Sequence, residues 1–286
     1  MFPEWLQWPL RQWVNAFIDW LVINFADSFE AVANAVLAVL VRIESALTAT
    51  PWWLVVLVLA AVAWHASRRV GLAVGVAGLL VLIGSLGLWN LAMQTLALML
   101  VAVGITVAIG IPLGIAMARS DLFRAGLRPL LDLMQTMPSF VYLIPAVMLF
   151  GLGKFSAVLA TVIYAVPPLI RLTDLGIRTV SPEVVESADA FGATPSQKLF
   201  GVQLPLAVPS IMAGVNQAVM MALAMVVIAS MIGARGLGEE VLLGLQRLDA
   251  GAGVAGGIAI VALAVVLDRI SQAYGERLRK HERAGR

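Results

Sequence analysis

The feature that most constrains this sequence is a succession of long apolar segments between residues 51 and 273, separated by short polar stretches. Hydrophobic residues make up 61% of the chain, whereas charged residues make up 13%, about half the share that is usual in soluble proteins. A surface with so few charges is suited to lipid rather than to water. The sequence therefore predicts an all-α, polytopic membrane protein.

The apolar segments are assigned to about seven transmembrane helices. An α-helix needs about 20 apolar residues to cross the hydrocarbon core of a bilayer, which is roughly 30 Å thick. The first and fifth segments are short for this task, and the third is expected to bend at Pro112, which lies near two glycines. The predicted spans are 51–66, 70–88, 90–118, 131–151, 155–171, 207–232 and 253–273.

The first 50 residues are assigned to helices that lie in the membrane interface. Arg11, Asn15 and Asp19 recur every four residues, and Trp and Phe side chains occupy the opposite face. This pattern is typical of an amphipathic helix at headgroup depth. The apolar run 31–41 is too short to cross the bilayer and is assigned to a second helix, at the interface or at the edge of the bundle. No cleaved signal peptide is expected, because the N-terminus lacks a basic start followed by an apolar core.

The placement of basic residues predicts the orientation in the inner (plasma) membrane. If the C-terminus is cytoplasmic, 14 of the 19 Lys and Arg residues fall in the cytoplasmic loops and tail. This bias follows the positive-inside rule, so the N-terminus is expected outside and the C-terminus in the cytoplasm. The expected organisation is an N-terminal interfacial part (1–50), peripheral spans (51–88), a core (90–273) with a cytoplasmic loop (172–206), and a basic tail (274–286).

The sequence offers no catalytic or metal-binding site. It contains no cysteine, and its two histidines, His65 and His281, lie far apart. None of its three lysines completes the Gly-rich motif that binds nucleotide phosphates, so the chain is not expected to bind ATP in that way. Asp132 and Asp268 lie near span ends, where a buried proton site is not expected. The chain is therefore expected to be no enzyme, to hold no cofactor or metal, and to take its energy from a partner.

The loop 172–206 contains the signals of two short, capped helices. A Ser-Pro pair at 181–182 starts the first, which Gly192 is expected to end. A Thr-Pro pair at 194–195 starts the second, with a Gln completing a capping box, and Pro205 is expected to stop it. Two short helices joined at a sharp glycine corner would form a rigid knob. A loop folded back on its own bundle is the alternative.

The spacing within this loop resembles the permease subunits of binding-protein-dependent ABC importers. Their cytoplasmic pattern is Glu-Ala-Ala, three residues, Gly, nine residues and Ile-x-Leu-Pro, and here the same spacing joins Glu-Ser-Ala at 186–188, Gly192 and Val-Gln-Leu-Pro at 202–205. The resemblance implies the type I importer permease fold and a coupling segment that docks in a cleft of a separate ATPase subunit. The residues that it implies for this contact are Glu186, Ser187, Ala188, Phe191, Gly192, Leu204 and Pro205.

Three more stretches resemble the permeases of glycine betaine/proline-type importers, and the resemblance runs from about residue 90 to 273. They are YLIPAVMLFGLGK, VIYAVPPLIRLTDLGIR and MVVIASMIGARGLGEEVLLGLQRLD. The resemblance implies a transmembrane path for quaternary ammonium osmolytes, a homodimer of this chain, two ATPase subunits that bind ATP and Mg²⁺, and a periplasmic or lipid-anchored solute-binding protein. It implies no nucleic-acid partner. The choice among betaine, choline, carnitine and proline stays open.

Two groups of residues are candidates for contact with the solute or its binding protein. All eight Trp precede residue 90, so the later spans offer no Trp-rich cage for a quaternary amine, and selection is assigned to the binding protein. Prolines and polar groups at span depth make Met137, Ser139, Tyr142, Asn216 and Gln217 candidates for the path, with ordinary helix packing as the alternative. Candidates for docking the binding protein are Arg235, Glu239, Glu240 and Arg247, with solvated loop charges as the alternative.

Other functions stay open from the sequence. The first is an ABC importer permease for another small solute, such as an amino acid. The second is an osmotic channel or secondary transporter, which would need no ATPase; a missing knob or a buried ion site would favour it. A membrane anchor or receptor would not explain spans so rich in Gly and Pro.

Overall fold

The computed structural model describes residues 8–284, with side chains as far as Arg277. The first seven residues of the predicted N-terminal part and the last two of the predicted tail lie outside the described residues. Within the described part the elements are helical, without a strand. They are α1 (Leu10–Ala49), α2 (Trp52–Ser67), α3 (Val70–Ser85), α4 (Trp89–Arg119), α5 (Asp121–Thr136), η2 (Ser139–Tyr142), α6 (Leu143–Phe150), α7 (Lys154–Arg178), α8 (Pro182–Ala190), α9 (Pro195–Lys198), the π-helical segment η3 (Leu199–Gln203), α10 (Leu204–Ser230), α11 (Leu237–Arg247) and α12 (Ala250–Ala284).

Five helices of the described part are long and apolar enough to cross a membrane, and a sixth span results if the bent pair of α5 and η2–α6 is counted as one. The five are α1, α4, α7, the run Pro195–Ser230 and α12. Two shorter apolar helices, α2 and α3, have 16 residues each, which gives them a length of about 24 Å. The expected all-α membrane fold is confirmed, with five or six candidate spans in place of about seven, because α2 and α3 are shorter than the roughly 30 Å thickness of the hydrocarbon core.

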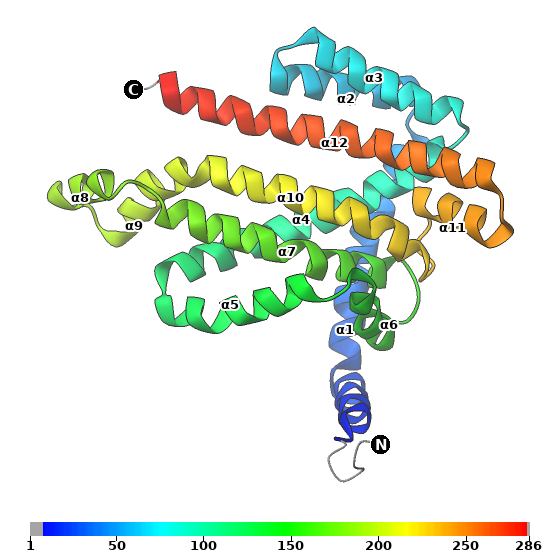
Figure 1. Cartoon of the computed structure of the whole chain (residues 1–286), viewed down its shortest axis with the longest axis horizontal. Coiled ribbons are helices and arrows are strands. Elements are labelled where there is room, and N and C mark those ends of the chain that lie inside the picture. Colours follow the sequence, from blue (N-terminus) through cyan, green and yellow to red (C-terminus); the bar gives the residue numbers. More distant parts are fainter. Residues whose placement is uncertain (1–7, 285–286) are drawn as a thin grey trace, which may run out of the picture.

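The long helices α4, α7, α10 and α12 run side by side (Figure 1), and α7 packs against both α4 and α10. The hairpin of α2 and α3 covers α12, and α11 packs against both α12 and α10. Small residues let the central helices approach closely, as is usual in membrane bundles. At Gly114 of α4, an added Cβ would lie 2.5 Å from Thr173 Cβ and 2.8 Å from the Ile170 carbonyl oxygen of α7.

We expect Gly114→Ala to destabilise the bundle, because neither the backbone nor the β-branched Thr173 can withdraw from the new methyl group. Overpacking of this kind costs about 1–3 kcal/mol. The matched control is Gly104→Ala in the same helix, where an added Cβ meets nothing within 4 Å. Alanine favours a helix over glycine by up to about 1 kcal/mol, so the control should be neutral or stabilising. The free energies of unfolding of the two variants are measured in mixed detergent. Equal values would contradict the close packing of α4 on α7 at Gly114.

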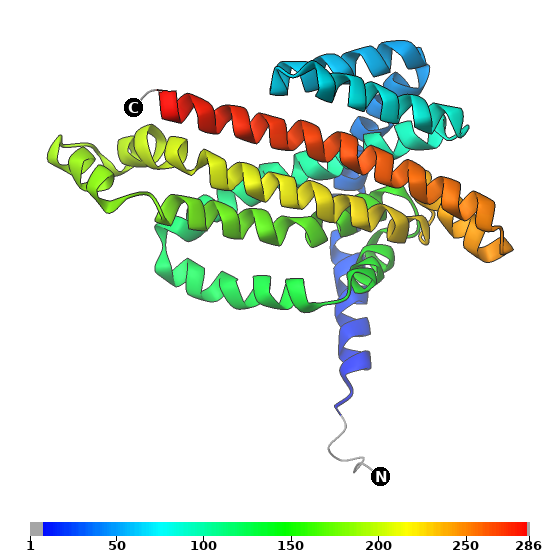
Figure 2. The same ribbon diagram turned by 45° about the horizontal axis from the view of Figure 1, so that its top comes forward.

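The N-terminal part differs from the prediction of two interfacial helices, because α1 is one continuous helix of 40 residues. No Gly or Pro lies between Leu10 and Ala49, so the polar residues that separate the two apolar runs do not end the helix. α1 lies crosswise to α10 and α12 in both views (Figures 1 and 2) and packs on α4 and α6 near its C-terminal end. If the parallel helices cross the bilayer, α1 runs along the membrane, as expected of an interfacial helix.

The predicted span 131–151 is divided by a sharp bend, and its helix begins earlier than expected. α5 begins at Asp121, because Ser120 caps it by accepting a hydrogen bond from the Phe123 amide. The helix ends at Thr136, since Met137 precedes a proline and is extended. The chain then turns by 113° into η2 and α6. In the same way α7 extends to Arg178, seven residues beyond the predicted end of its span.

Candidate coupling surface and transport path

A knob formed by residues 182–203 projects from one end of the bundle (Figures 1 and 2). Its first helix, α8, has proline at its first position, where a missing amide proton costs nothing. α8 ends at Ala190, and the chain turns at Gly192, whose φ of +75° lies in the left-handed region that glycine adopts without steric cost. The Gly192 amide donates to the Asp189 carbonyl at 2.9 Å, which closes the corner. The predicted corner at Gly192 is therefore confirmed, whereas Ser181 caps α8 without a side-chain hydrogen bond.

The second half of the knob is fixed to the first. Thr194 and Gln197 form the predicted capping box, in which the Gln197 amide donates to Thr194 Oγ1 and the Thr194 amide donates to Gln197 Oε1. Lys198 then reaches back to both carboxylate oxygens of Asp189, at 2.8 and 2.9 Å. Contacts on both sides of the corner make the knob a defined shape rather than a loose loop.

Pro205 does not stop the second knob helix as predicted. A π-helical segment, η3, connects α9 directly to α10, so the helical path continues from Pro195 to Ser230. Pro205 occupies the first turn of α10, where proline is tolerated because its missing amide proton has no required partner there. Leu199 is buried with Ile177 and Ala207, which anchors the base of the knob on α7 and α10.

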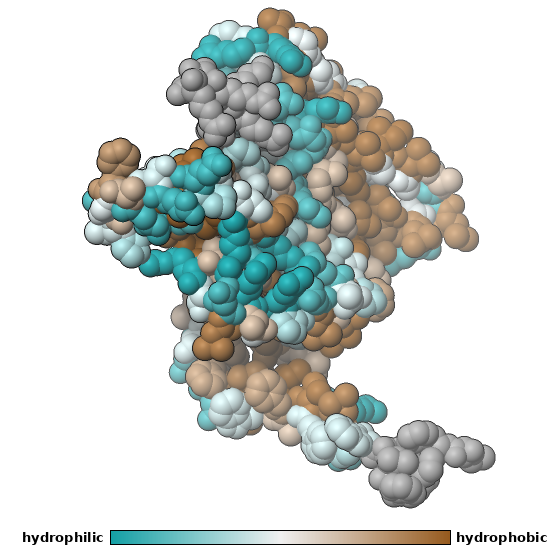
Figure 3. All heavy atoms as spheres, turned by 60° about the vertical axis from the view of Figure 1, so that its left-hand side comes forward, coloured by the Kyte–Doolittle hydropathy of each residue, from teal (hydrophilic) through white to brown (hydrophobic). Residues whose placement is uncertain are grey.

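The knob presents apolar side chains to its surroundings. Phe191, at the corner, is 92% exposed, and Phe200 is 63% exposed. Glu186 is also exposed, whereas Leu204 is half-buried at the base of the knob. Figure 3 turns this end toward the viewer and shows hydrophilic residues gathered over it, beside a hydrophobic flank. The predicted coupling residues thus fall into two sets: 186–192 on the exposed tip, and Leu204 and Pro205 at its base.

A network of ion pairs at the same end joins α4, α5 and α7, and it was not foreseen from the sequence. Asp174, whose side chain is 4% exposed, pairs with Arg178 at 2.8 Å and with Arg124 at 3.1 Å. Arg178 also pairs with Asp121 at 2.8 Å and donates to the Met117 carbonyl oxygen at 2.9 Å. The available signal was the spacing of Asp174 and Arg178, one helical turn apart. The network fixes the end of α7 four residues before the knob begins.

The first candidate path residues lie together at the bend between α5 and α6. Tyr142 is buried, its hydroxyl donates to the Met134 carbonyl oxygen, and its ring lies 5.8 Å from that of Tyr164. Met137 and Ser139 are half-buried. In this conformation Tyr142 therefore connects η2 to α5 across the bend, and its side chain is buried in the protein rather than exposed to a path.

The other two candidates lie elsewhere, between α10 and α12. Asn216 and Gln217 line a hollow of about 480 Å³, and Asn216 Oδ1 accepts a hydrogen bond from Ser271 Oγ at 2.5 Å. Gln217 is exposed. None of Met137, Ser139 and Tyr142 lines this hollow, so within one chain the structure does not bring the two groups into a single lining.

The candidate docking residues lie at the opposite end of the bundle from the knob, around α11 (Figure 1). Arg235 and Arg247 are exposed, whereas Glu239 and Glu240 are half-buried in the first turn of α11, where their charges favour the helix dipole. The Leu237 amide donates to Thr95 Oγ1 of α4 at 2.9 Å, which ties this segment to the core. The segment is therefore well supported, and it exposes the apolar Leu245 and Leu248 beside its charged residues.

Comparison with known proteins identifies the family. The family model described as "Binding-protein-dependent transport system inner membrane component" matches residues 110–280. The chain belongs to this family. As a member, it is a multi-pass protein of the inner membrane and a component of a binding-protein-dependent transport system.

Named relatives align over almost the whole of this family member. It is 51% identical over 269 residues to the glycine betaine/proline betaine transport system permease protein ProW of Escherichia coli (strain K12), which covers 93% of this chain and 75% of ProW. It is 46% identical over 264 residues to the glycine betaine transport system permease protein OpuAB of Bacillus subtilis (strain 168), which covers 92% of this chain and 93% of OpuAB. The likeness therefore extends well before residue 90, the limit inferred from the motifs.

The fold is that of a known type of importer permease. A chain of the MetNI methionine ABC transporter, in an inward-facing conformation, matches with a TM-score of 0.56 and 22% sequence identity. The match covers 65% of this chain and 92% of that chain. The type I permease fold expected from the coupling-loop spacing is thereby confirmed.

Proposed function

We propose that this permease forms the transmembrane path for quaternary ammonium osmolytes of the glycine betaine class, in a homodimer driven by two separate ATPase subunits. The observation that carries the proposal is the projecting knob, with a glycine corner at Gly192 and an almost fully exposed Phe191. An aromatic side chain exposed to this degree on a rigid corner is suited to insertion in a partner's pocket. The substrate class rests on the names of the relatives.

The knob would link the ATPase cycle to the bundle. If the ATP-bound and ATP-free states of the partner hold the knob differently, the difference in contacts shifts the bundle between inward-facing and outward-facing states. In this proposal Glu186, Phe191 and Phe200 contact the partner. Asn216 and Gln217 line the path, and Arg235 and Arg247 meet the solute-binding protein at the other end.

Uptake of radiolabelled glycine betaine tests the proposal. The permease is expressed together with its ATPase subunit and its solute-binding protein in a host that lacks its own betaine importers. We expect saturable, ATP-dependent uptake that unlabelled glycine betaine suppresses and methionine does not. Uptake of an amino acid without uptake of betaine would favour the alternative of an amino-acid importer. Uptake that persists without the ATPase would favour a channel or secondary transporter.

The proposed orientation has the knob and C-terminus in the cytoplasm and α11 outside. Because the chain has no cysteine, single cysteines report accessibility without background. Ser196 in the knob and Gln246 in α11 are exposed positions for them. In intact cells we expect Gln246→Cys to react with a membrane-impermeant maleimide and Ser196→Cys to react only after permeabilisation. The reverse pattern would invert the assigned topology.

A further inference from the structure

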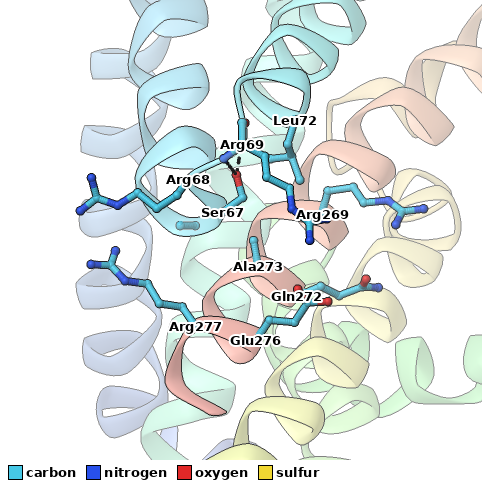
Figure 4. Close-up of a pocket in the computed structure, with 10 residues that line it drawn as sticks. Ser67, Arg68, Arg69, Leu72, Arg269, Gln272, Ala273, Glu276 and Arg277 are labelled. Carbon is cyan, nitrogen blue, oxygen red and sulfur yellow. Dashed lines mark hydrogen bonds between the residues drawn. The ribbon is translucent and has the colours of Figure 1, made fainter. Parts of the chain in front are cut away.

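Four arginines line one hollow between the α2–α3 turn and α12; the Arg69 side chain lies over it, and the guanidinium groups of the other three lie around its sides (Figure 4). Arg68 and Arg69 form the turn itself, and Arg269 and Arg277 lie two helical turns apart on α12. The hollow has a volume of about 220 Å³, and Glu276 is the one acidic residue that lines it. Arginines from two parts of the sequence thus line one hollow, and the residues that line it have a formal net charge of +3. We call it the arginine pocket.

Three of the four arginines of the pocket are not paired with a carboxylate of the described residues. Among the described residues, Arg68, Arg69 and Arg269 form no ion pair, whereas Arg124, Arg171 and Arg178 together form four ion pairs with carboxylates of α5 and α7. Arg277 donates to the His65 carbonyl oxygen at 2.7 Å, which fixes α12 against the end of α2. In Figure 4 the Arg69 side chain extends over the hollow toward Ala273. A hollow lined by arginines of which Arg68, Arg69 and Arg269 form no ion pair with the described residues is suited to an anion.

The surroundings of the pocket place it beside lipid headgroups. α2 and α3 expose apolar side chains along their lengths, including Leu57, Val58 and Val74, so their outer faces contact acyl chains. Trp64, one turn before Arg68, is 48% exposed, and the Arg68 guanidinium lies 5.6 Å from the centre of its ring. Exposed Trp beside Arg at the end of an apolar helix is typical of the membrane–water interface.

We propose that the arginine pocket binds the phosphate group of an anionic phospholipid headgroup. The planar guanidinium fork matches phosphate oxygens in pairs, and basic pockets between transmembrane helices are suited to phospholipid headgroups. The acyl chains would then lie along α2 and α3, the peripheral hairpin that packs on α12. Bound lipid would join this hairpin to the core through charge as well as through apolar contact.

The backbone at Arg68 supplies a clean variant. Arg68 has a φ of +57°, in the left-handed region, which glycine adopts without steric strain and arginine does not. Arg68→Gly therefore removes a guanidinium group without straining the turn. The double variant Arg69→Gln/Arg269→Gln removes two more. The matched control is Arg128→Gln, at an exposed arginine of α5 that does not line the pocket.

Native mass spectrometry of the full chain purified in detergent measures the binding of phosphatidylglycerol, with phosphatidylcholine as the neutral comparison. We expect a preference for phosphatidylglycerol that falls roughly 30-fold in the double variant, at about 1 kcal/mol for each arginine. Arg68→Gly should also weaken the binding of phosphatidylglycerol, and its unfolding temperature should be unchanged or higher. Arg128→Gln should bind phosphatidylglycerol as the parent protein does. Equal binding in all variants would overturn the site. Displacement of the lipid by millimolar inorganic phosphate would overturn the lipid assignment in favour of a soluble phosphate.

Discussion

Replacing Gly192 with valine is expected to abolish most uptake while the permease still reaches the membrane at its normal level. The φ of +75° at Gly192 is unfavourable for a β-branched residue, and strain of this kind costs about 1–3 kcal/mol. If this strain must be overcome for the knob to dock on the ATPase, the equilibrium constant for docking falls about 5- to 150-fold. An added Cβ at this position meets nothing within 4 Å, so backbone conformation alone is tested.

The matched control is Gly192→Asn, because asparagine tolerates the left-handed region better than other side chains do. It should retain most uptake and most co-purifying ATPase. Glu186→Lys reverses a charge on the exposed tip and leaves the corner unchanged, so it should lose uptake for a different reason. Uptake in vesicles and ATPase co-purification from the same membranes provide the measurements. Full uptake with Gly192→Val and Glu186→Lys would leave the knob without a coupling role.

Removing the carboxylate of Asp174 should cost about 1.5–3 kcal/mol of stability, because Arg124 and Arg178 each lose a contact with a buried carboxylate while both stay partly exposed to solvent. Asp121 pairs with the same Arg178, but its side chain is 86% exposed, so Asp121→Ala should cost no more than about 1 kcal/mol. Unfolding of Asp174→Ala and Asp121→Ala in mixed detergent gives the two free energies. A small and equal loss in both would mean that the network does not stabilise the end of α7.

The features that the sequence predicts best depend on residues close together in the chain. The capping box of Thr194 and Gln197 and the corner at Gly192 are set within four residues, and both are present. The family pattern in the same loop predicts the fold, which the MetNI likeness confirms. Local chemistry and a spaced motif were sufficient because neither depends on which helix packs against which.

Features that depend on tertiary contacts could not be predicted. Arg178 donates a hydrogen bond to the carbonyl oxygen of Met117, 61 residues earlier, and no pattern in a single sequence predicts this contact. Tyr142 was assigned to the path because it is a polar group within a span, yet the bend at Pro138 turns it into the protein. The break predicted within residues 1–50 is absent because a polar residue interrupts an apolar face without interrupting a helix.

The two connections of the knob to the bundle differ mechanically. On one side, α8 is separated from α7 by the non-helical residues 179–181, which can absorb a rotation. On the other, the helical run Pro195–Ser230, about 54 Å long, passes through η3 without interruption and reaches the turn before α11. If the proposed ATPase partner moves the knob, we expect the movement to pass along α10 to the opposite end of the bundle. α10 would then move against α7, with which it packs and whose end the Asp174 ion pairs hold.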